Sequence, residues 1–469
     1  MDSSTAPCNG ARVNRALPAI IFLFITFLIR LPILQHSVLD WDESLYFLVA
    51  RAWLNGHLPY TTIWDNKPPG IYAIFAIFQS VIPGIQAIRI AAVVCISVLA
   101  WAVSEVTFTL SNCRAAGWAA GCLLILCSLS NDGLSSNTEL FMDCFTILAV
   151  LALVRDTPPW VPGLLLGCGF MVKYVCAPEI LVALGLLWHR RRTAHSMIEA
   201  LLASSIPLLA VTLLYAFAGR LSLWWECGIA SNFRRAEIPF SMRSISTAAV
   251  QQCERWGTLY LAGAWAAVRG SPEEVPTWFL PAWLIAAVIG AVGAKCFYDH
   301  YFLEILPPLC VAAGLILARL PRRWQVWLAV LAVLASLPLR AGILALSQAS
   351  GPDPQRIAAN VLKAANAKSL YVFDGQPILY ALTKLPPPTY YAFPSELVGN
   401  SLASVAGVNP VAEVGRILAE KPQYIVRHSW PRDTKNTNEL VYAEMDEALA
   451  AHYSLWRRIN GGVDIYKRK

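Results

Sequence analysis

The sequence has few charged residues: Asp, Glu, Lys and Arg make up 14% of its 469 positions. An average soluble protein is about one quarter charged, so a purely soluble enzyme does not fit this composition. Hydrophobic residues make up 57% and the mean hydropathy is +0.51, which excludes a disordered chain. The length suits a membrane domain of ten or more helices followed by one soluble domain.

The sequence also lacks a cysteine framework. Its 12 cysteines are scattered, no C-x-x-C occurs, and no histidine accompanies them at zinc-binding spacing. Neither a zinc finger nor a set of disulfides is therefore indicated. We expect these cysteines to be small buried hydrophobic residues. No internal repeat and no low-complexity tract is visible.

Apolar runs up to residue 346 predict transmembrane helices, since a hydrocarbon core requires about 20 mainly apolar residues per helix. The first run follows Arg12 and Arg15 and has no small-x-small cleavage site after it, so we expect a retained helix instead of a signal peptide. The segment 71–83 is too short to span and is expected at the interface or partway into the membrane. Eleven spans result, or up to thirteen if the short ones are divided differently. They cover residues 17–35, 86–110, 115–131, 140–155, 160–176, 178–189, 197–219, 247–268, 277–294, 302–319 and 324–346.

The distribution of cations sets the expected orientation. Short loops on one side hold basic clusters at 189–192 and 321–323, so the positive-inside rule places this side and the N-terminus in the cytoplasm. The longer loops on the opposite face also contain many Lys and Arg residues. An anionic ligand held on that outer face would explain them.

The composition becomes polar from residue 347. We expect residues 1–346 to form the membrane domain and 347–469 a small extracytoplasmic α/β domain, because helical and strand patterns alternate there. The role of this domain stays open. Helices are expected at 354–367, 411–420 and 438–451, strands at 369–373 and 423–427, and a terminal hairpin at 453–459 and 462–467.

The first outer loop, residues 36–70, holds the densest set of polar motifs. These are D-W-D-E-S-L-Y at 40–46, G-H-L-P-Y at 56–60 and D-N-K-P-P-G at 65–70. One interpretation is purely local. Asp40 then caps a helix whose first turn holds Asp42 and Glu43, and Lys67 is an interfacial cation.

Taken together, D-E-x-x-Y, G-x-x-P-Y and K-P-P-G resemble the first outer loop of GT-C glycosyltransferases. The bacterial branch related to protein O-mannosyltransferases and lipid A aminoarabinose transferases is the most similar. Three further segments extend the resemblance over residues 17–345. They are Asn137-Thr138-Glu139, a glycine-rich stretch from Gly163 to Lys173, and His300-Tyr301 followed by Pro307-Pro308. The resemblance implies a polytopic GT-C fold and a polyprenyl-phosphate-linked sugar as co-substrate.

Two departures limit what the resemblance implies. The residues around the D-E pair differ from those of the aminoarabinose transferases, so the resemblance does not identify the donor sugar of this protein. The O-mannosyltransferases usually have histidine where Lys67 stands, and often a binding domain for acceptor protein that is absent here. Protein mannosylation is therefore not implied.

The resemblance also assigns roles in the first loop. Because phosphate is a good leaving group, the reaction needs one carboxylate to take the acceptor's proton and cations to meet the charge on the departing phosphate. Asp42 matches the family's catalytic aspartate. Glu43 is expected to orient the acceptor or a metal. Lys67 is expected to bind the donor phosphate, since the two following prolines restrict the backbone that presents it.

Other residues of this face are candidates, each with a simpler alternative. Glu139 is a candidate second-loop acid for the acceptor; the alternative is an ordinary helix start at the interface. Lys173, His300, Tyr301 and Arg255 are candidates for the donor phosphate. The alternative is an interfacial belt of cations and aromatic residues, with Arg234 and Arg235, that contacts lipid headgroups.

The sequence thus predicts a multi-pass glycosyltransferase of the inner (plasma) membrane that moves a hexosyl or pentosyl group, with inversion, at the outer face. The acceptor is an envelope lipid, glycan or protein. No organic cofactor and no nucleic acid partner is expected, and a divalent metal stays open. The alternatives are a transporter or flippase for lipid-linked sugars and a non-catalytic scaffold. Transporters tend to hold ionisable residues at the membrane midplane in repeated halves, whereas here these residues gather at one face.

Overall fold

The computed structural model describes residues 16–469 apart from 238, 240, 270, 271, 273, 294, 321–341, 345, 348, 349 and 430–436. In these residues, ten of the eleven expected spans coincide with helices. They are α1 (Ala16–Arg30) with η1 (Leu31–Ile33), α4 (Gln86–Ser111), α5 (Arg114–Cys127), α6 (Thr138–Val154), α7 (Trp160–Phe170), α8 (Ala177–Arg191), α9 (Ala194–Phe217), α12 (Met242–Arg269), α13 (Phe279–Gly293), and η4 (Asp299–Ile305) with α14 (Leu306–Ala318). Most of the eleventh expected span, 324–346, lies outside the described residues, as do Arg12, Arg15 and the basic cluster at 321–323.

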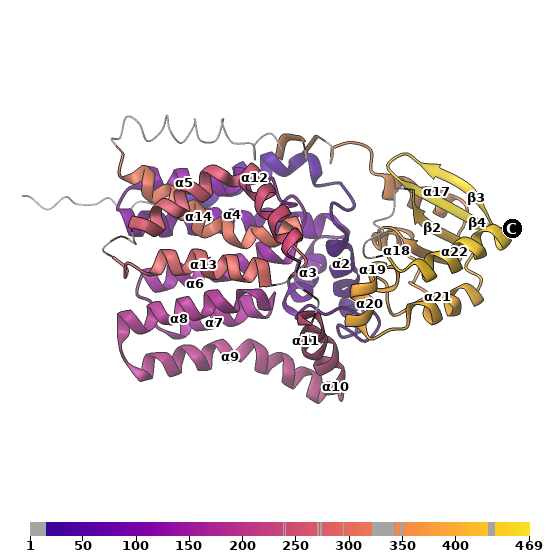
Figure 1. Ribbon diagram of the computed structural model, residues 1–469, viewed down its shortest axis with the longest axis horizontal. Coiled ribbons are helices and arrows are strands. Elements are labelled where there is room, and N and C mark those ends of the chain that lie inside the picture. Colours follow the sequence, from indigo (N-terminus) through magenta and orange to yellow (C-terminus); the bar gives the residue numbers. More distant parts are fainter. Residues whose placement is uncertain are drawn as a thin grey trace, which may run out of the picture.

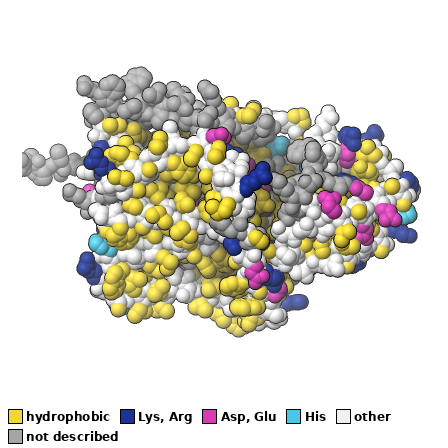
Figure 2. Space-filling view, in the orientation of Figure 1, with side chains coloured by type: hydrophobic (Ala, Val, Ile, Leu, Met, Phe, Trp, Pro, Cys, Tyr) yellow, Lys and Arg dark blue, Asp and Glu magenta, His cyan; other side chains and the backbone are white. Residues whose placement is uncertain are grey.

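Within the described residues, three helical stretches are long and apolar enough to cross a membrane: α4, α9, and η4 continued by α14. The shorter apolar helices include α3 (Gly70–Val81), α5, α7 and α13. Figure 1 shows the long helices side by side in one bundle, and hydrophobic side chains cover much of its outside in Figure 2. Leu202 and Phe217 of α9 are 65% and 87% exposed. An apolar outer face of this extent is suited to hydrocarbon and not to water.

The first loop is folded into a helix, α2 (Trp41–Leu54), that leads towards α3. Asp40 caps α2: its Oδ1 accepts a hydrogen bond from the Trp41 backbone N–H at 2.6 Å, and Glu43 reaches back to the Asp40 N–H at 3.3 Å. This is a capping box, which satisfies backbone donors that the helix itself leaves unpaired. The local interpretation of Asp40 is therefore confirmed.

Short helices connect α9 to α12. They are α10 (Leu221–Trp224), the π-helical turn η3 (Trp225–Ala230) and α11 (Ser231–Ala236). α12 itself is bent where Trp256 leaves helical dihedral angles. This connection matters because it carries Arg235 to the end of the bundle on which α2 and α3 lie (Figure 1).

A four-stranded sheet with helices forms the C-terminal part. The strands are β1 (Leu370–Asp374), β2 (Tyr424–His428), β3 (Tyr453–Ile459) and β4 (Val463–Arg468), in the order β1-β2-β4-β3. β1 pairs with β2 in parallel, and the hairpin of β3 and β4 adds antiparallel strands. The expected strands and the helices α17 (Pro354–Ala364), α21 (Pro410–Ala419) and α22 (Glu439–His452) are confirmed. The sequence did not predict α18 (Ile378–Thr383), α19 (Ser395–Val398) or α20 (Asn400–Ala406).

The C-terminal part docks on the first loop. The Trp64 backbone N–H donates to the Tyr390 carbonyl at 2.9 Å, and the Tyr390 hydroxyl donates to the Tyr60 carbonyl at 2.6 Å. At the other edge, Ser37 Oγ donates to Asp353 Oδ1 at 2.7 Å. These contacts bring α19 and α20 over the loop. The domain boundary expected at 346/347 adjoins residues outside the described part and stays a prediction.

Candidate functional site

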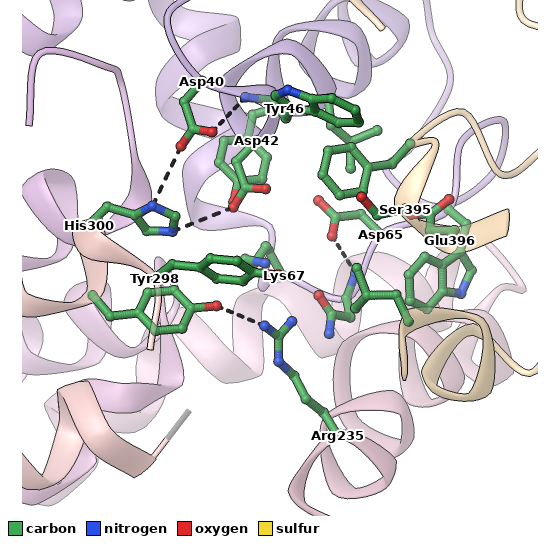
Figure 3. A pocket seen from close by; sticks show the side chains of 17 residues that line it. Asp40, Asp42, Tyr46, Asp65, Lys67, Arg235, Tyr298, His300, Ser395 and Glu396 are labelled. Atoms are coloured by element: carbon green, nitrogen blue, oxygen red, sulfur yellow. Dashed lines mark hydrogen bonds and ion pairs between the residues drawn. The ribbon is translucent and has the colours of Figure 1, made fainter. Parts of the chain in front are cut away.

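A cavity of about 280 Å³, the loop cavity, lies between the first loop, η4 and the C-terminal part (Figure 3). Four segments far apart in the chain supply its walls. The lining residues include Asp40, Trp41, Asp42 and Tyr46 from the start of α2, and Trp64, Asp65, Asn66 and Lys67 from the rest of the first loop. They also include Arg235 of α11, Tyr298, His300 and Tyr301 at η4, and Phe393, Ser395 and Glu396 from the C-terminal part. Asp42 and Lys67, the two residues on which the sequence prediction rests, line the same cavity.

Asp42 reaches the cavity from the first turn of α2. Its Oδ2 accepts a hydrogen bond from the Tyr46 hydroxyl, one helical turn further on, at 2.9 Å. Burial acts to raise the pKa of this carboxyl, but the Lys67 ammonium and His300 outweigh burial, and the pKa lies below its ordinary value. Asp42 is therefore a carboxylate at neutral pH, as a proton acceptor has to be.

Lys67 is fixed by its surroundings. Gly70, three residues on, donates its backbone N–H to the Met171 carbonyl at 2.7 Å, and the Lys67 carbonyl accepts from the Tyr60 hydroxyl. The ammonium lies 5.9 Å from the centre of the Tyr46 ring. Within the described chain, no hydrogen bond or ion pair engages this ammonium. It is therefore available to an anion in the cavity.

His300 lies between the first two aspartates of the loop. Its Nδ1 is 3.5 Å from Asp40 Oδ2 and its Nε2 is 4.0 Å from Asp42 Oδ2. Asp40 Oδ2 also accepts a hydrogen bond from Asn137 Nδ2 at 2.7 Å. Burial, helped by the neighbouring Asp42 carboxylate, raises the pKa of Asp40 to about 7. The pair Asp40 and Asp42 is thus divided into one group that titrates near neutrality and one that stays ionised.

A second cavity of about 330 Å³, the helix cavity, adjoins the first. Asn66, Lys67, Arg235 and Tyr301 line both cavities, so the two adjoin at these side chains. The wall of the helix cavity includes Ile289 of α13, which is 54% exposed on the apolar surface of the bundle. The helix cavity therefore lies next to lipid, whereas the loop cavity lies beneath the C-terminal part.

Further cations gather where the two cavities meet. Arg235 Nη2 donates to the Tyr301 hydroxyl at 2.7 Å. The Lys173 ammonium lies 3.9 Å from the centre of the Tyr301 ring and forms a buried ion pair with Glu139. Lys173 lines the helix cavity, but Glu139 lines neither cavity. Glu139 thus stands behind Lys173 and neutralises it in part.

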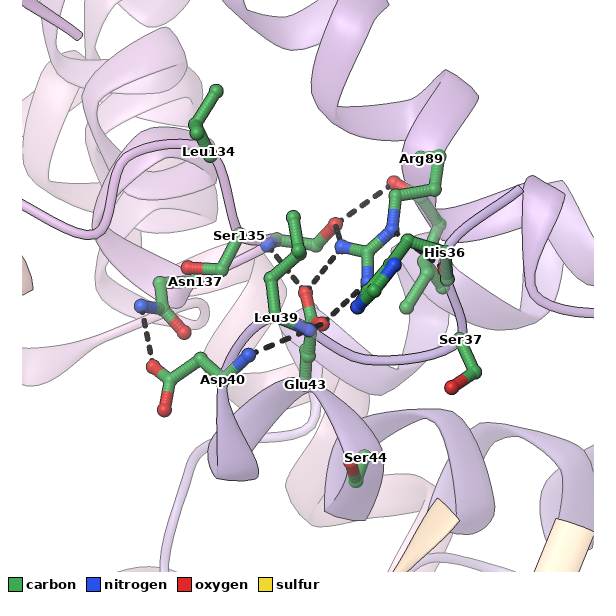
Figure 4. Close-up of polar contacts among 12 residues, drawn as sticks. His36, Ser37, Leu39, Asp40, Glu43, Ser44, Arg89, Leu134, Ser135 and Asn137 are labelled. Carbon is green, nitrogen blue, oxygen red and sulfur yellow. Dashed lines mark hydrogen bonds and ion pairs between the residues drawn. The ribbon is translucent and has the colours of Figure 1, made fainter. Parts of the chain in front are cut away.

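Glu43 and Arg255, like Glu139, line neither cavity. Glu43 is fully buried and forms a two-pronged ion pair with Arg89, with both oxygen–nitrogen distances 2.5 Å (Figure 4). Its Oε2 also accepts from the Ser136 backbone N–H at 2.8 Å. Arg255 pairs with Asp299 at 2.8 Å. Each of the two is therefore engaged by a partner elsewhere and does not join Asp42 and Lys67 in the loop cavity.

The structure also adds site residues that the sequence analysis did not single out. Asp65 belongs to the D-N-K-P-P-G motif, in which the sequence assigns it no role. Arg235 is expected from the sequence only as part of an interfacial belt. Glu396, 1% exposed, lies more than 300 positions from the first loop and belongs to no motif. Only the docking of the C-terminal part brings Glu396 to the cavity, so no signal in the sequence identified it.

The arrangement as a whole brings the Asp42 carboxylate together with three cations around two adjoining cavities. In the described part of the chain, no group of three or more His, Cys, Asp or Glu residues is placed to hold a metal ion. The chemistry available from the side chains is proton acceptance by Asp42 and stabilisation of negative charge by Lys67, Arg235 and Lys173.

Comparisons with known proteins agree with the resemblance seen in the sequence. Residues 66–215, about a third of the chain, match the family model described as dolichyl-phosphate-mannose-protein mannosyltransferase. Among solved structures, ArnT from Cupriavidus metallidurans bound to undecaprenyl phosphate aligns with a TM-score of 0.65 at 13% identity, covering 96% of this chain and 97% of that one. The same protein in the apo state gives a TM-score of 0.62 at 12% identity over 95% and 97%.

A more distant similarity is found with the archaeal oligosaccharyltransferase AglB from Archaeoglobus fulgidus, at a TM-score of 0.48 and 13% identity over 88% of this chain and 69% of that one. No curated protein matches the chain by sequence. The alignment with ArnT shows that the chain shares its fold over almost the whole length. The expected fold class, a polytopic helical membrane protein with a small C-terminal sheet region, is confirmed.

Proposed function

We propose that the chain is a membrane glycosyltransferase that moves a sugar from a polyprenyl-phosphate carrier to an acceptor of the cell envelope. The observation that carries the proposal is that Asp42 and Lys67 line one cavity, together with Arg235. The shared fold with ArnT, a structure of which holds undecaprenyl phosphate, supports a lipid phosphate as the donor's carrier. We further propose that the site faces the outside of the inner membrane, with the N-terminus in the cytoplasm.

The donor phosphate would lie where the two cavities meet. Lys67 and Arg235 line both cavities, and Lys173 lines the helix cavity. The helix cavity adjoins the apolar side of the bundle, so a prenyl chain would leave the phosphate towards lipid along Ile289. This geometry supports a carrier that enters from the membrane and keeps its chain there.

The reaction would be a single displacement with inversion. Asp42 accepts the proton of the acceptor hydroxyl while that oxygen bonds to the anomeric carbon of the donor sugar. The bond between that carbon and the phosphate oxygen breaks, and the electron pair leaves with the lipid phosphate. Lys67, Arg235 and Lys173 meet the charge that develops there, which is the usual way in which preorganised cations lower such a barrier. No step requires a metal or an organic cofactor.

The test is the Asp42→Asn variant in full-length purified protein and in cells. Loss of a positioned general base typically lowers the rate about 10²- to 10⁴-fold, so we expect the envelope glycan made by the wild type to disappear from mass spectra. Asp156→Asn serves as the matched control, because Asp156 lies beyond the far end of α6 and has a positive φ that asparagine tolerates.

Three outcomes separate the functions that the sequence left open. Loss of sugar transfer in Asp42→Asn with retained binding of undecaprenyl phosphate supports the transferase. Unchanged glycans in this variant would contradict it and favour a scaffold. Movement of lipid-linked sugar across vesicles by the wild type, without transfer to any acceptor, would favour a flippase.

A further inference from the structure

Three buried polar atoms without a hydrogen-bond partner in the described chain belong to residues that line the loop cavity. They are Asn66 Nδ2, His300 Nε2 and Glu396 Oε2. Their side chains are 3%, 6% and 1% exposed. Buried polar groups in folded proteins are nearly always hydrogen-bonded, because leaving one unpaired is costly. Three such atoms around one cavity indicate that a polar ligand supplies their missing hydrogen bonds.

Charge is distributed unevenly around this ligand position. Lys67 and Arg235 belong to the walls that the two cavities share. The remaining wall of the loop cavity contains the acids Asp40, Asp42, Asp65 and Glu396 and no Lys or Arg. In Figure 3, Asp65 and Glu396 lie together on the side of the cavity away from His300. A ligand bound there would meet carboxyl groups as hydrogen-bond partners, and the cations among the lining residues are the shared Lys67 and Arg235.

The loop cavity also has flat apolar surface. Trp41, Trp64 and Phe393 line it, and Trp41 meets Phe393 edge to face with 6.2 Å between ring centres. Asp65 is held by the Tyr72 hydroxyl, which donates to its Oδ2 at 2.7 Å. Flat rings beside fixed carboxyl groups suit a ligand that has apolar faces and a rim of hydroxyl groups. A sugar ring combines these two properties.

Burial, with the nearby Asp65, raises the pKa of Glu396 well above its ordinary value. Glu396 is therefore an uncharged acid that can donate one hydrogen bond and accept others. A sugar hydroxyl likewise donates one hydrogen bond and accepts others.

We propose that Asp65 and Glu396, with the aromatic wall, form a subsite for an uncharged sugar ring of the acceptor, so that the acceptor group is a glycan hydroxyl and not a phosphate. The C-terminal part thus contributes directly to the choice of acceptor. This inference rests on the proposed transferase function, and its test includes a separate measurement for that function.

The experiment uses the full chain in detergent and follows tryptophan fluorescence, since Trp41 and Trp64 line the subsite. The probes are a panel of neutral methyl hexosides and pentosides, the hexose 6-phosphates, and a serine-containing tripeptide. We expect a neutral glycoside to bind in the millimolar range and its phosphorylated form at least tenfold more weakly. Preferred binding of the phosphate or of the peptide, or no glycoside binding at all, would overturn the inference.

Variants of Glu396 identify the chemistry. Glu396→Leu removes an unpaired buried polar atom, so the variant should fold, and we expect at least a tenfold loss of glycoside affinity. Glu396→Gln retains a donor and an acceptor and should stay within threefold of wild type. Glu447→Leu, at an exposed glutamate of α22, is the matched control and should bind as wild type does. If Glu396→Gln loses as much as Glu396→Leu, the subsite requires charge and the inference is wrong.

Two lipid measurements keep this inference apart from the proposed function. Undecaprenyl phosphate should bind wild type and Glu396→Leu equally, and failure to bind wild type would count against the transferase itself. In the presence of saturating undecaprenyl-phosphate-linked hexose, glycoside affinity should be unchanged. Competition between the two would instead assign the subsite to the donor's sugar and overturn the acceptor assignment.

Discussion

Asp42 and Glu43 are neighbours in the sequence, yet their carboxylates serve different surroundings. Asp42 lines the loop cavity, while Glu43 points into the protein and binds Arg89 with two 2.5 Å contacts. Successive residues of a helix point about 100° apart, and this rotation directs Glu43 away from the cavity and towards Arg89. The separation divides the D-E motif into a residue that lines the cavity and a residue that fixes the start of α2.

Glu43→Gln should therefore reduce stability more than Asp42→Asn does. The change leaves Arg89 buried without its counterion, and breaking such a pair costs about 3–5 kcal/mol. Thermal unfolding in detergent should show a clearly lower midpoint for Glu43→Gln. The double variant Glu43→Leu with Arg89→Met should recover part of the loss, because neither charge is then buried alone. An unchanged midpoint in Glu43→Gln would contradict the structural role.

Lys67→Met should weaken binding of undecaprenyl phosphate about tenfold, or ~1.4 kcal/mol. The reason is the loss of one charge-assisted contact to phosphate. Lys363→Met, at an exposed lysine of α17, is the control and should leave affinity unchanged. Titration of the lipid into purified protein in nanodiscs measures both. Equal affinities in the two variants would remove Lys67 from the phosphate site.

Asp40 should make stability depend on pH. Its folded pKa of about 7 lies above the ordinary value of 3.8, so the folded state holds this proton more tightly than the unfolded state does. The stabilisation is complete below pH 3.8 and is lost as pH rises through about 7, at no more than about 1.4 kcal/mol per pH unit.

Asp40→Asn keeps an N-cap residue but removes the titration. The midpoint of thermal unfolding, measured from pH 5 to pH 8, should fall less steeply with pH in this variant than in wild type. Parallel curves for the two proteins would show that Asp40 does not titrate in this range.

Gly70→Ala should disturb the lysine loop through the backbone. A Cβ at Gly70 would stand 2.3 Å from the Met171 carbonyl oxygen, to which the Gly70 N–H is bonded. Relief of this clash requires a backbone shift, with a cost of about 1–3 kcal/mol, and would move Lys67 away from Lys173. Gly257→Ala is the control, because nothing lies within 4 Å of its added Cβ. We expect lower stability and weaker lipid binding for Gly70→Ala only.

Much of the fold is present in local patterns of the sequence. Apolar runs predict the helices of the bundle because each must cover its backbone polar groups in lipid. Short strand-like runs between helical segments likewise predict all four strands of the C-terminal sheet, since strand and helix periodicities differ. The short helices α18, α19 and α20 were missed because they are too short to show a period. Their position depends on packing between complete elements, since α18 packs against α2 and α20 against α11.

The sequence by itself determined that Asp42 and Lys67 belong to one loop next to a membrane helix. Only 25 positions separate Asp42 from Lys67 in the chain. Because helices anchor both ends of the loop, the two residues stay in the same region of the molecule. Only the tertiary structure decided which acid faces the cavity and which remote residues join it. Arg235 and Glu396 reach the site through contacts between segments more than 150 positions apart. Local periodicity carries no information about such contacts, because they are fixed by packing of complete elements.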